Sequence, residues 1–188
     1  ALVATEDSRF YEHSGIDFYA LGRAIVKRGI MGRRSAGGGS TITQQLAKQL
    51  YSETAKNTVE RLLQKPIEWV IAVKLERNYT KEEIIAMYLN YFDFLHNAVG
   101  IKTAASTYFN KEPKTLSIVE AATLIGLCKN PSYFNPVRYP ERCTERRNVV
   151  LSQMCKAGYI TQTQLSELSA EPMKLNFRRI DHKDGIAV

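Results

Sequence analysis

Helix start signals recur along this chain, and almost none of it alternates between apolar and polar residues as a β-strand does. Capping boxes, in which Ser or Thr is followed three positions later by Glu or Gln, occur at residues 41–44, 80–83, 117–120 and 161–164. Each box precedes apolar residues at helical spacing, and Gly158 and Pro172 act as stop signals. The pattern predicts a mainly α domain with one short extended stretch at residues 173–180.

Length and charge limit the kind of molecule. The 188 residues are 44% hydrophobic and carry a net charge of +7, which suits one globular domain over residues 1–188 with an anionic partner. Residues 18–52 hold several Arg and Lys and no Asp or Glu. No nucleic-acid-binding signature accompanies this charge, so nucleic acid is not the predicted partner. The chain begins abruptly at Ala1, and we expect a fragment of a longer protein.

The stretch GGGSTITQQLAKQL, residues 37–50, has two interpretations. Thr41 and Gln44 form a capping box, which predicts a helix with Ile42 and Leu46 packed inward. A glycine-rich approach to a helix N-terminus is also a physical anion site, because free N–H groups and the helix dipole favour negative charge there. Both interpretations stay open at this point.

Two further stretches contain acidic residues that are candidates for a catalytic role. Glu6 and Asp7 are adjacent and are followed by Phe10 and His13; a solvated face and a catalytic base are both compatible with them. Residues 57–78 have a helical pattern interrupted by Pro66, which predicts either a kink or a new helix start. Lys65 and Glu68 lie close to that irregularity and three positions apart, hence on one helix face.

The stretches EDSRFYEHSGID, GGSTITQQLAKQL, QKPIEW, KEEIIAMYLN and AASTYFNK occur in this order over residues 6–111. Together they resemble the successive motifs of the peptidoglycan glycosyltransferases, glycosyltransferase family 51, which occur in class A penicillin-binding proteins and monofunctional transglycosylases. The resemblance implies a lysozyme-like helical domain at the outer face of the bacterial cytoplasmic membrane. It implies an enzyme that polymerises lipid II into β-1,4-linked glycan strands. The growing lipid-linked chain is the donor, the incoming lipid II attacks it with inversion, and polyprenyl diphosphate is released. Inhibition by moenomycin, a part in cell shape and contacts with other cell-wall synthesis proteins follow from the same resemblance.

The resemblance also implies roles for residues. Glu6 matches the general base, and Glu68 matches the second acid, which assists the diphosphate directly or through a divalent cation. Lys48 and Lys65 match basic residues near the diphosphate. The remaining residues expected to bind substrate are Asp7, Phe10, His13, Ser40, Thr41, Gln44, Gln45, Arg61 and Asn90. No cofactor is obligatory; Mg²⁺ or Mn²⁺ is optional, with Glu68 as the candidate ligand.

Three positions depart from the family pattern. Gln64 stands where an Arg usually precedes Lys65, and Arg61, one turn earlier, is the candidate substitute. Ala86 replaces a usual acid, and Leu95 replaces a common glycine. Since none of these changes affects Glu6 or Glu68, we predict an active enzyme.

Residues 17–34 mix apolar and basic side chains. This mixture is typical of an interfacial helix followed by a mobile, membrane-proximal loop, and a plain amphipathic helix with a solvated face explains it equally well.

Two functions other than lipid II polymerisation are also compatible with the sequence. A muramidase of lysozyme-like fold would use two carboxylates too, and a degenerate domain would bind lipid II without catalysis.

Overall fold

The computed structural model describes residues 1–29, 39–51 and 58–179, and these are almost entirely helical. The helices at the start of the chain are α1 (Leu2–Glu6), the 3₁₀ helix η1 (Phe10–Glu12), α2 (Phe18–Gly29), α3 (Ile42–Tyr51), α4 (Thr58–Asn78) and α5 (Lys81–Tyr91). Those that follow are α6 (Ile101–Phe109), the 3₁₀ helix η2 (Pro113–Thr115), α7 (Ile118–Leu127), α8 (Pro140–Lys156) and α9 (Gln162–Ala170). The only β pairing among the described residues is an isolated bridge between Asp93 and Val99, so the mainly α prediction is confirmed.

The chain divides into two compact units. The N-terminal unit is Glu6–Tyr88, and the C-terminal unit is Ala1–Thr5 together with Leu89–Val188. In the N-terminal unit α3 packs against α4, and its buried core includes Phe10, Ile42 and Leu46. The predicted single domain over residues 1–188 stays a prediction.

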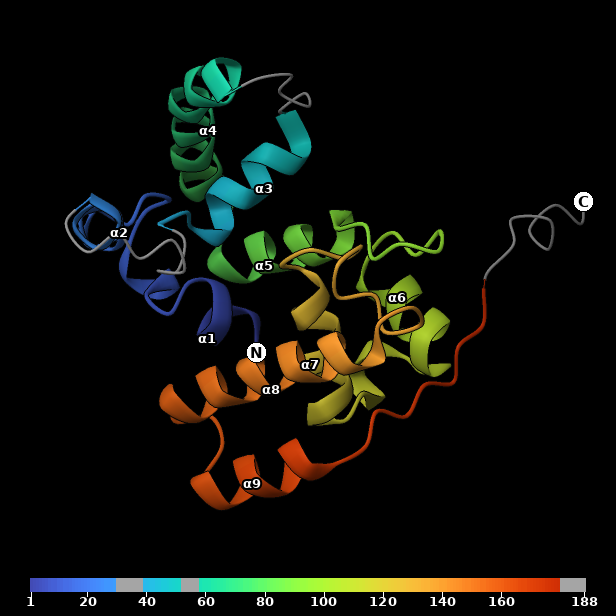
Figure 1. The fold of residues 1–188 in the computed structure, drawn as a ribbon. Helices are drawn as coiled ribbons and strands as arrows, with labels where there is room; N and C mark the ends of the chain where they lie inside the picture. Colours follow the sequence, from blue (N-terminus) through green and yellow to red (C-terminus); the bar gives the residue numbers. More distant parts are fainter. Residues whose placement is uncertain (30–38, 52–57, 180–188) are drawn as a thin grey trace, which may run out of the picture. The chain divides into compact units, whose positions relative to one another are not determined.

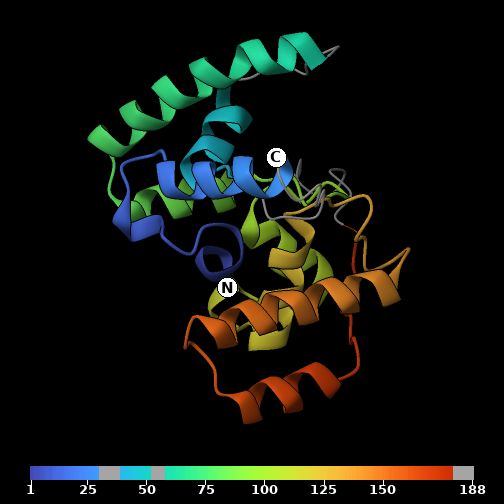
Figure 2. The ribbon, with the colours of Figure 1, turned by 60° about the vertical axis from the view of Figure 1, so that its left-hand side comes forward.

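The C-terminal unit is built around α7, which packs against α6, α8 and α9. Figures 1 and 2 show α8 and α9 as neighbouring antiparallel helices joined by a short turn. Gly158, with a φ of +77°, lies in that turn, as expected for a glycine that closes a helix. The caps at Ser117 and Thr161 are both complete capping boxes, as the sequence predicts.

Pro66 does not end a helix, since α4 continues through it from Thr58 to Asn78. Its ring is exposed, where a missing backbone N–H does least damage. Lys65 and Glu68 therefore share one unbroken helix. The extended stretch after α9 pairs with no strand among the described residues; instead the N–H groups of Asn176 and Arg178 donate to the carbonyls of Tyr108 and Thr107 at the end of α6.

Leu95, which stands where glycine is common in the family, has a φ of +68°, and His96 and Asn97 after it are also left-handed. Such a conformation strains a bulky residue. A hydrogen bond from the Leu95 N–H to Asp93 Oδ1 (2.8 Å) and an edge-to-face contact between the His96 and Phe177 rings hold the turn in place. The backbone at Leu95 thus has a conformation that glycine favours, although the residue is leucine.

Candidate active site

The loop that follows Glu6 is organised by the carboxylate of Asp7. His13 Nε2 lies 3.0 and 3.1 Å from the two oxygens of Asp7, and both side chains are buried. The N–H of Gly15 donates to His13 Nδ1 over 3.2 Å, which places the ring proton on Nε2. His13 therefore donates to Asp7 and accepts from Gly15, and the loop closes on itself directly after Glu6.

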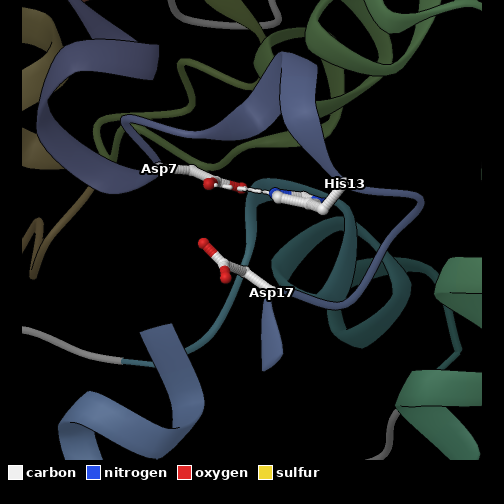
Figure 3. Close-up of side chains that lie close together, drawn as sticks. All are labelled: Asp7, His13 and Asp17. Atoms are coloured by element: carbon white, nitrogen blue, oxygen red, sulfur yellow. Dashed lines mark hydrogen bonds and ion pairs between the residues drawn. The ribbon is translucent and has the colours of Figure 1, made fainter. Parts of the chain in front are cut away.

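Asp7, His13 and Asp17 also form the one group among the described residues whose ligand atoms, within 4.8 Å of one another, could hold a metal ion. Figure 3 shows the Asp7–His13 contact and the carboxylate of Asp17 facing it. A metal needs an unprotonated ring nitrogen, but the Gly15 N–H occupies the one on His13. Asp17 in turn accepts the Ala20 N–H at the start of α2 (2.9 Å). This donor set fits a hydrogen-bonded cluster and does not fit a divalent cation.

Thr41 caps α3, as the sequence predicts. Its Oγ1 accepts the Gln44 N–H (3.1 Å) and donates to the carbonyl of Gly15 (2.7 Å). The Gln44 side chain does not complete the capping box; its amide donates to the same Gly15 carbonyl (3.3 Å), and its oxygen accepts from Ser40 Oγ (3.1 Å). Thr41 and Gln44 are consequently buried supports for the loop that contains His13 and Gly15.

The N-terminus of α3 does hold an anion, and the anion belongs to the protein. The Ile42 N–H donates to Asp7 Oδ2 over 3.1 Å. A carboxylate at this position is stabilised by the helix dipole as well as by the hydrogen bond. Thr41 is therefore the cap and Asp7 occupies the helix N-terminus, while a substrate diphosphate at this stretch stays a prediction. Gly37 and Gly38, expected to contribute to a diphosphate site, lie outside the described residues.

Glu6 is contacted by α3 through Gln45. The Gln45 amide nitrogen donates to Glu6 Oε2 over 3.3 Å, and its oxygen accepts the phenol proton of Tyr88 over 3.1 Å. Glu6 and Gln45 are half-buried, whereas Tyr88 is fully buried. Sequence reasoning gave Tyr88 no role of its own, and its place inside the motif KEEIIAMYLN was the one signal of such a role.

Lys65 and Glu68 form a pair within α4. Lys65 Nζ lies 2.9 Å from Glu68 Oε2, and the Glu68 side chain is only 1% exposed. Burial of a carboxylate is costly without such a partner. Arg61 belongs to the same helix, but its side chain lies outside the described residues. Lys48 is exposed on α3, and Asn90 is exposed in the C-terminal unit.

A second set of contacts, which sequence reasoning missed, centres on the ammonium group of Lys81. It donates to the carbonyl of His13 (2.6 Å) and pairs with Glu76 (2.8 Å), and it lies 4.3 Å from the centre of the Phe10 ring. Glu76 also accepts from Thr43 Oγ1 (2.5 Å). Lys81 thus fastens the loop after Glu6 to α3 and α4. Phe10 is fully buried by this arrangement.

Two helices of the N-terminal unit expose apolar rows. On α2 the exposed residues are Phe18, Tyr19, Ile25 and Val26, and on α4 they are Val59, Leu63, Ile67 and Val70. Each set recurs at the spacing of one helix face. Among the described residues, no helix is both long enough and apolar enough to cross a bilayer. The loop predicted after α2, residues 30–38, lies outside the described residues.

A scan against known families matches residues 1–155 to the model described as Transglycosylase. Penicillin-binding protein 1F of Bacillus subtilis is 40% identical over 179 residues, which are 95% of this chain and 24% of that protein. Penicillin-binding protein 1A of Escherichia coli is 41% identical over 94% of this chain and 20% of its own length.

A solved structure gives the same result for the fold. The crystal structure of penicillin-binding protein 1A from Haemophilus influenzae matches 72% of this chain and 17% of its own with a TM-score of 0.50 and 27% identity. The chain therefore spans between about a sixth and a quarter of the length of these relatives.

Proposed function

Because this chain belongs to the transglycosylase family, we propose that it polymerises lipid II into the glycan strands of peptidoglycan. The observation that carries the proposal is the family match over residues 1–155, which contains both Glu6 and Glu68. The transfer is inverting: it forms β-1,4 links and releases polyprenyl diphosphate. The whole protein would act at the outer face of the bacterial cytoplasmic membrane.

Glu6 serves as the general base in this proposal. An inverting displacement needs one base that removes the proton of the attacking hydroxyl. The 4-hydroxyl of the incoming lipid II gives its proton to Glu6, and its oxygen forms the new bond to C1 of the donor sugar. The bond from C1 to the diphosphate breaks, and the diphosphate leaves with the electron pair. The support is the Gln45 contact, which fixes one Glu6 oxygen in place (3.3 Å).

Cationic side chains serve the leaving group. A diphosphate leaves readily once its negative charge is met by cations and N–H donors. We assign Lys65 and Lys48 to this task, with Arg61 as the substitute for the arginine that Gln64 replaces. We assign no obligatory metal; Mg²⁺ or Mn²⁺ at Glu68 would have to compete with the Lys65 ammonium group, which lies 2.9 Å from that carboxylate.

The other expected site residues divide by burial. Gln45 and Lys48 are the members of α3 placed to contact substrate, since Gln45 is half-buried and Lys48 is exposed. Asp7, Phe10, Thr41 and Gln44 are buried, and we assign them to the support of the substrate-binding surface. His13 and Ser40 donate hydrogen bonds to these supporting residues. We assign Asn90, which belongs to the C-terminal unit, to substrate binding.

Membrane association is the second part of the proposal. The exposed apolar rows of α2 and α4 support it, because the transfer of aliphatic and aromatic side chains from water to a bilayer interface lowers the free energy. Arg23, exposed on α2, suits an anionic lipid surface. Co-sedimentation with anionic vesicles tests it; replacement of Ile25 and Leu63 by Ser should release the protein, and undiminished binding would contradict this part.

Purified lipid II and intact sacculi, supplied separately, test the enzymatic proposal. We expect glycan polymer from lipid II, inhibited by moenomycin, and no soluble muropeptides from sacculi. Muropeptide release without polymer would establish the muramidase alternative, and binding of lipid II without either product would establish the scaffold alternative. Parallel reactions with Mg²⁺ and with a chelator measure the contribution of a divalent cation.

A further inference from the structure

Three side chains from distant parts of the N-terminal unit form a continuous row of hydrogen bonds. The phenol of Tyr88 donates to Gln45 Oε1 (3.1 Å), and Gln45 Nε2 donates to Glu6 Oε2 (3.3 Å). We propose that Tyr88 is a positioning residue for Glu6 and acts through the amide of Gln45. The inference rests on the proposed function, in which Glu6 is the general base.

The donor and acceptor roles in this row of hydrogen bonds follow from the chemical groups of Tyr88, Gln45 and Glu6. An amide has a donating end and an accepting end, and only the donating end can face a carboxylate. Gln45 must therefore turn its oxygen away from Glu6, and that oxygen lies against the phenol of Tyr88. A reversed amide would set its oxygen against the Glu6 carboxylate. The phenol proton thus selects the one amide orientation that serves Glu6.

Tyr88 is suited to this task because it is packed in the interior of the N-terminal unit. Its side chain is fully buried at 0% exposure, and it sits on α5 beside the buried Ile84. Gln45 and Glu6, by contrast, are half-buried and have several rotatable bonds. An amide torsion is broad without a partner, so the fixed phenol supplies the restraint. A general base must stay within hydrogen-bond distance of the proton that it removes, and small misplacements lower the rate strongly.

Tyr108 provides a matched control. It is also fully buried, and its phenol donates to a backbone carbonyl, that of Phe94, over 2.6 Å. It belongs to the C-terminal unit and has no part in the proposed chemistry. Tyr88→Phe and Tyr108→Phe each delete one oxygen and one buried hydrogen bond, so both should lower the melting temperature. Only the first should affect catalysis.

The experiment measures kcat and KM for lipid II polymerisation by the full-length protein in detergent. Tyr88→Phe should lower kcat about tenfold with little change in KM, while Tyr108→Phe keeps the kcat of the unmodified protein. In a double-mutant cycle, Tyr88→Phe should add nothing to the loss already caused by Gln45→Ala. If Tyr88→Phe does not fold, Gln45→Met gives the second test: it keeps the side-chain length, removes the donor and should also lower kcat about tenfold.

The results separate the two proposals. An unchanged kcat in Tyr88→Phe, a loss equal to that of Tyr108→Phe, or losses at Tyr88 and Gln45 that multiply would overturn the positioning role and leave Glu6 as the base. If Tyr88→Phe does not fold, an unchanged kcat in Gln45→Met has the same meaning. Full polymerisation by Glu6→Gln would instead overturn the base assignment, and the positioning role with it.

Discussion

The backbone N–H of Ile42 donates a 3.1 Å hydrogen bond to the carboxylate of Asp7, which lies 35 positions earlier in the chain. Because Asp7 directly follows Glu6, this one contact ties the position of the proposed base to the first turn of α3. His13 contacts the same carboxylate oxygen at 3.0 Å. Glu6 is thus placed by its neighbour in sequence as well as by its own contact with Gln45.

Glu6→Gln should abolish polymerisation and leave the fold intact. An amide cannot accept the proton of the attacking hydroxyl, and removal of a general base costs about 10²- to 10⁴-fold in rate. A lipid II assay measures the loss, and circular dichroism checks the fold. Glu12→Gln is the control, since Glu12 lies in the same loop, exposed and paired with Arg9 (2.9 Å); it should retain full activity.

Lys81→Met should lower the free energy of unfolding by about 3 kcal/mol, because it leaves the Glu76 carboxylate, 5% exposed, without its cation. Urea unfolding at neutral pH measures the change. Lys111→Met removes a comparable ion pair, to Glu120, in which the lysine is 40% exposed, and should cost less than about 1 kcal/mol. An equal decrease in the free energy of unfolding in the two variants would show that the contacts of Lys81 stabilise the protein no more than an exposed ion pair does.

Gly15→Ala should destabilise the protein by at least about 3 kcal/mol. The new methyl group would lie 2.9 Å from the backbone carbon and oxygen of Ala72, at a φ of +95° that disfavours any side chain. Gly158→Ala is the matched control: its φ is +77°, but nothing lies within 4 Å, so only about 1 kcal/mol should be lost. Thermal unfolding of both variants decides, and a smaller loss at position 15 than at 158 would refute the close approach.

Stability should fall as the pH rises above about 9, because burial raises the pKa of the Cys143 thiol from 9.0 to about 12, although the nearby Arg147 acts in the opposite direction. The native state keeps a proton that the unfolded chain releases, so this contribution is complete below pH 9 and is lost toward pH 12. For one group the slope reaches about 1.4 kcal/mol per pH unit.

Urea unfolding between pH 8 and 11 measures this slope, which should be shallower in Cys143→Ala. Part of the slope should persist in that variant, because burial also raises the pKa of Tyr108. Identical slopes with and without the thiol would remove Cys143 as the cause.

Local signals in the sequence were enough for most of the helices. The boxes at Ser117 and Thr161 form as predicted because their contacts lie within four residues. Gln44 departs from its predicted box because a carbonyl 29 positions away, that of Gly15, competes for its amide. The roles of Lys81 and Tyr88 were not predictable, since each depends on partners 68 and 43 positions distant. Pro66 shows the opposite case, a strong local signal for a break inside a helix that continues, with the proline ring exposed where a missing backbone N–H does least damage.

The row from Tyr88 through Gln45 to Glu6 has a consequence for folding. Its two hydrogen bonds join residues 43 and 39 positions apart in the chain. Closing loops of this length lowers the entropy of the chain before the stabilising contacts form. Helix formation, which is local, precedes them. Glu6 consequently depends for its working geometry on contacts that local helix formation does not supply, and a chain with all its helices formed but without the Tyr88–Gln45 contact would lack that restraint on Glu6.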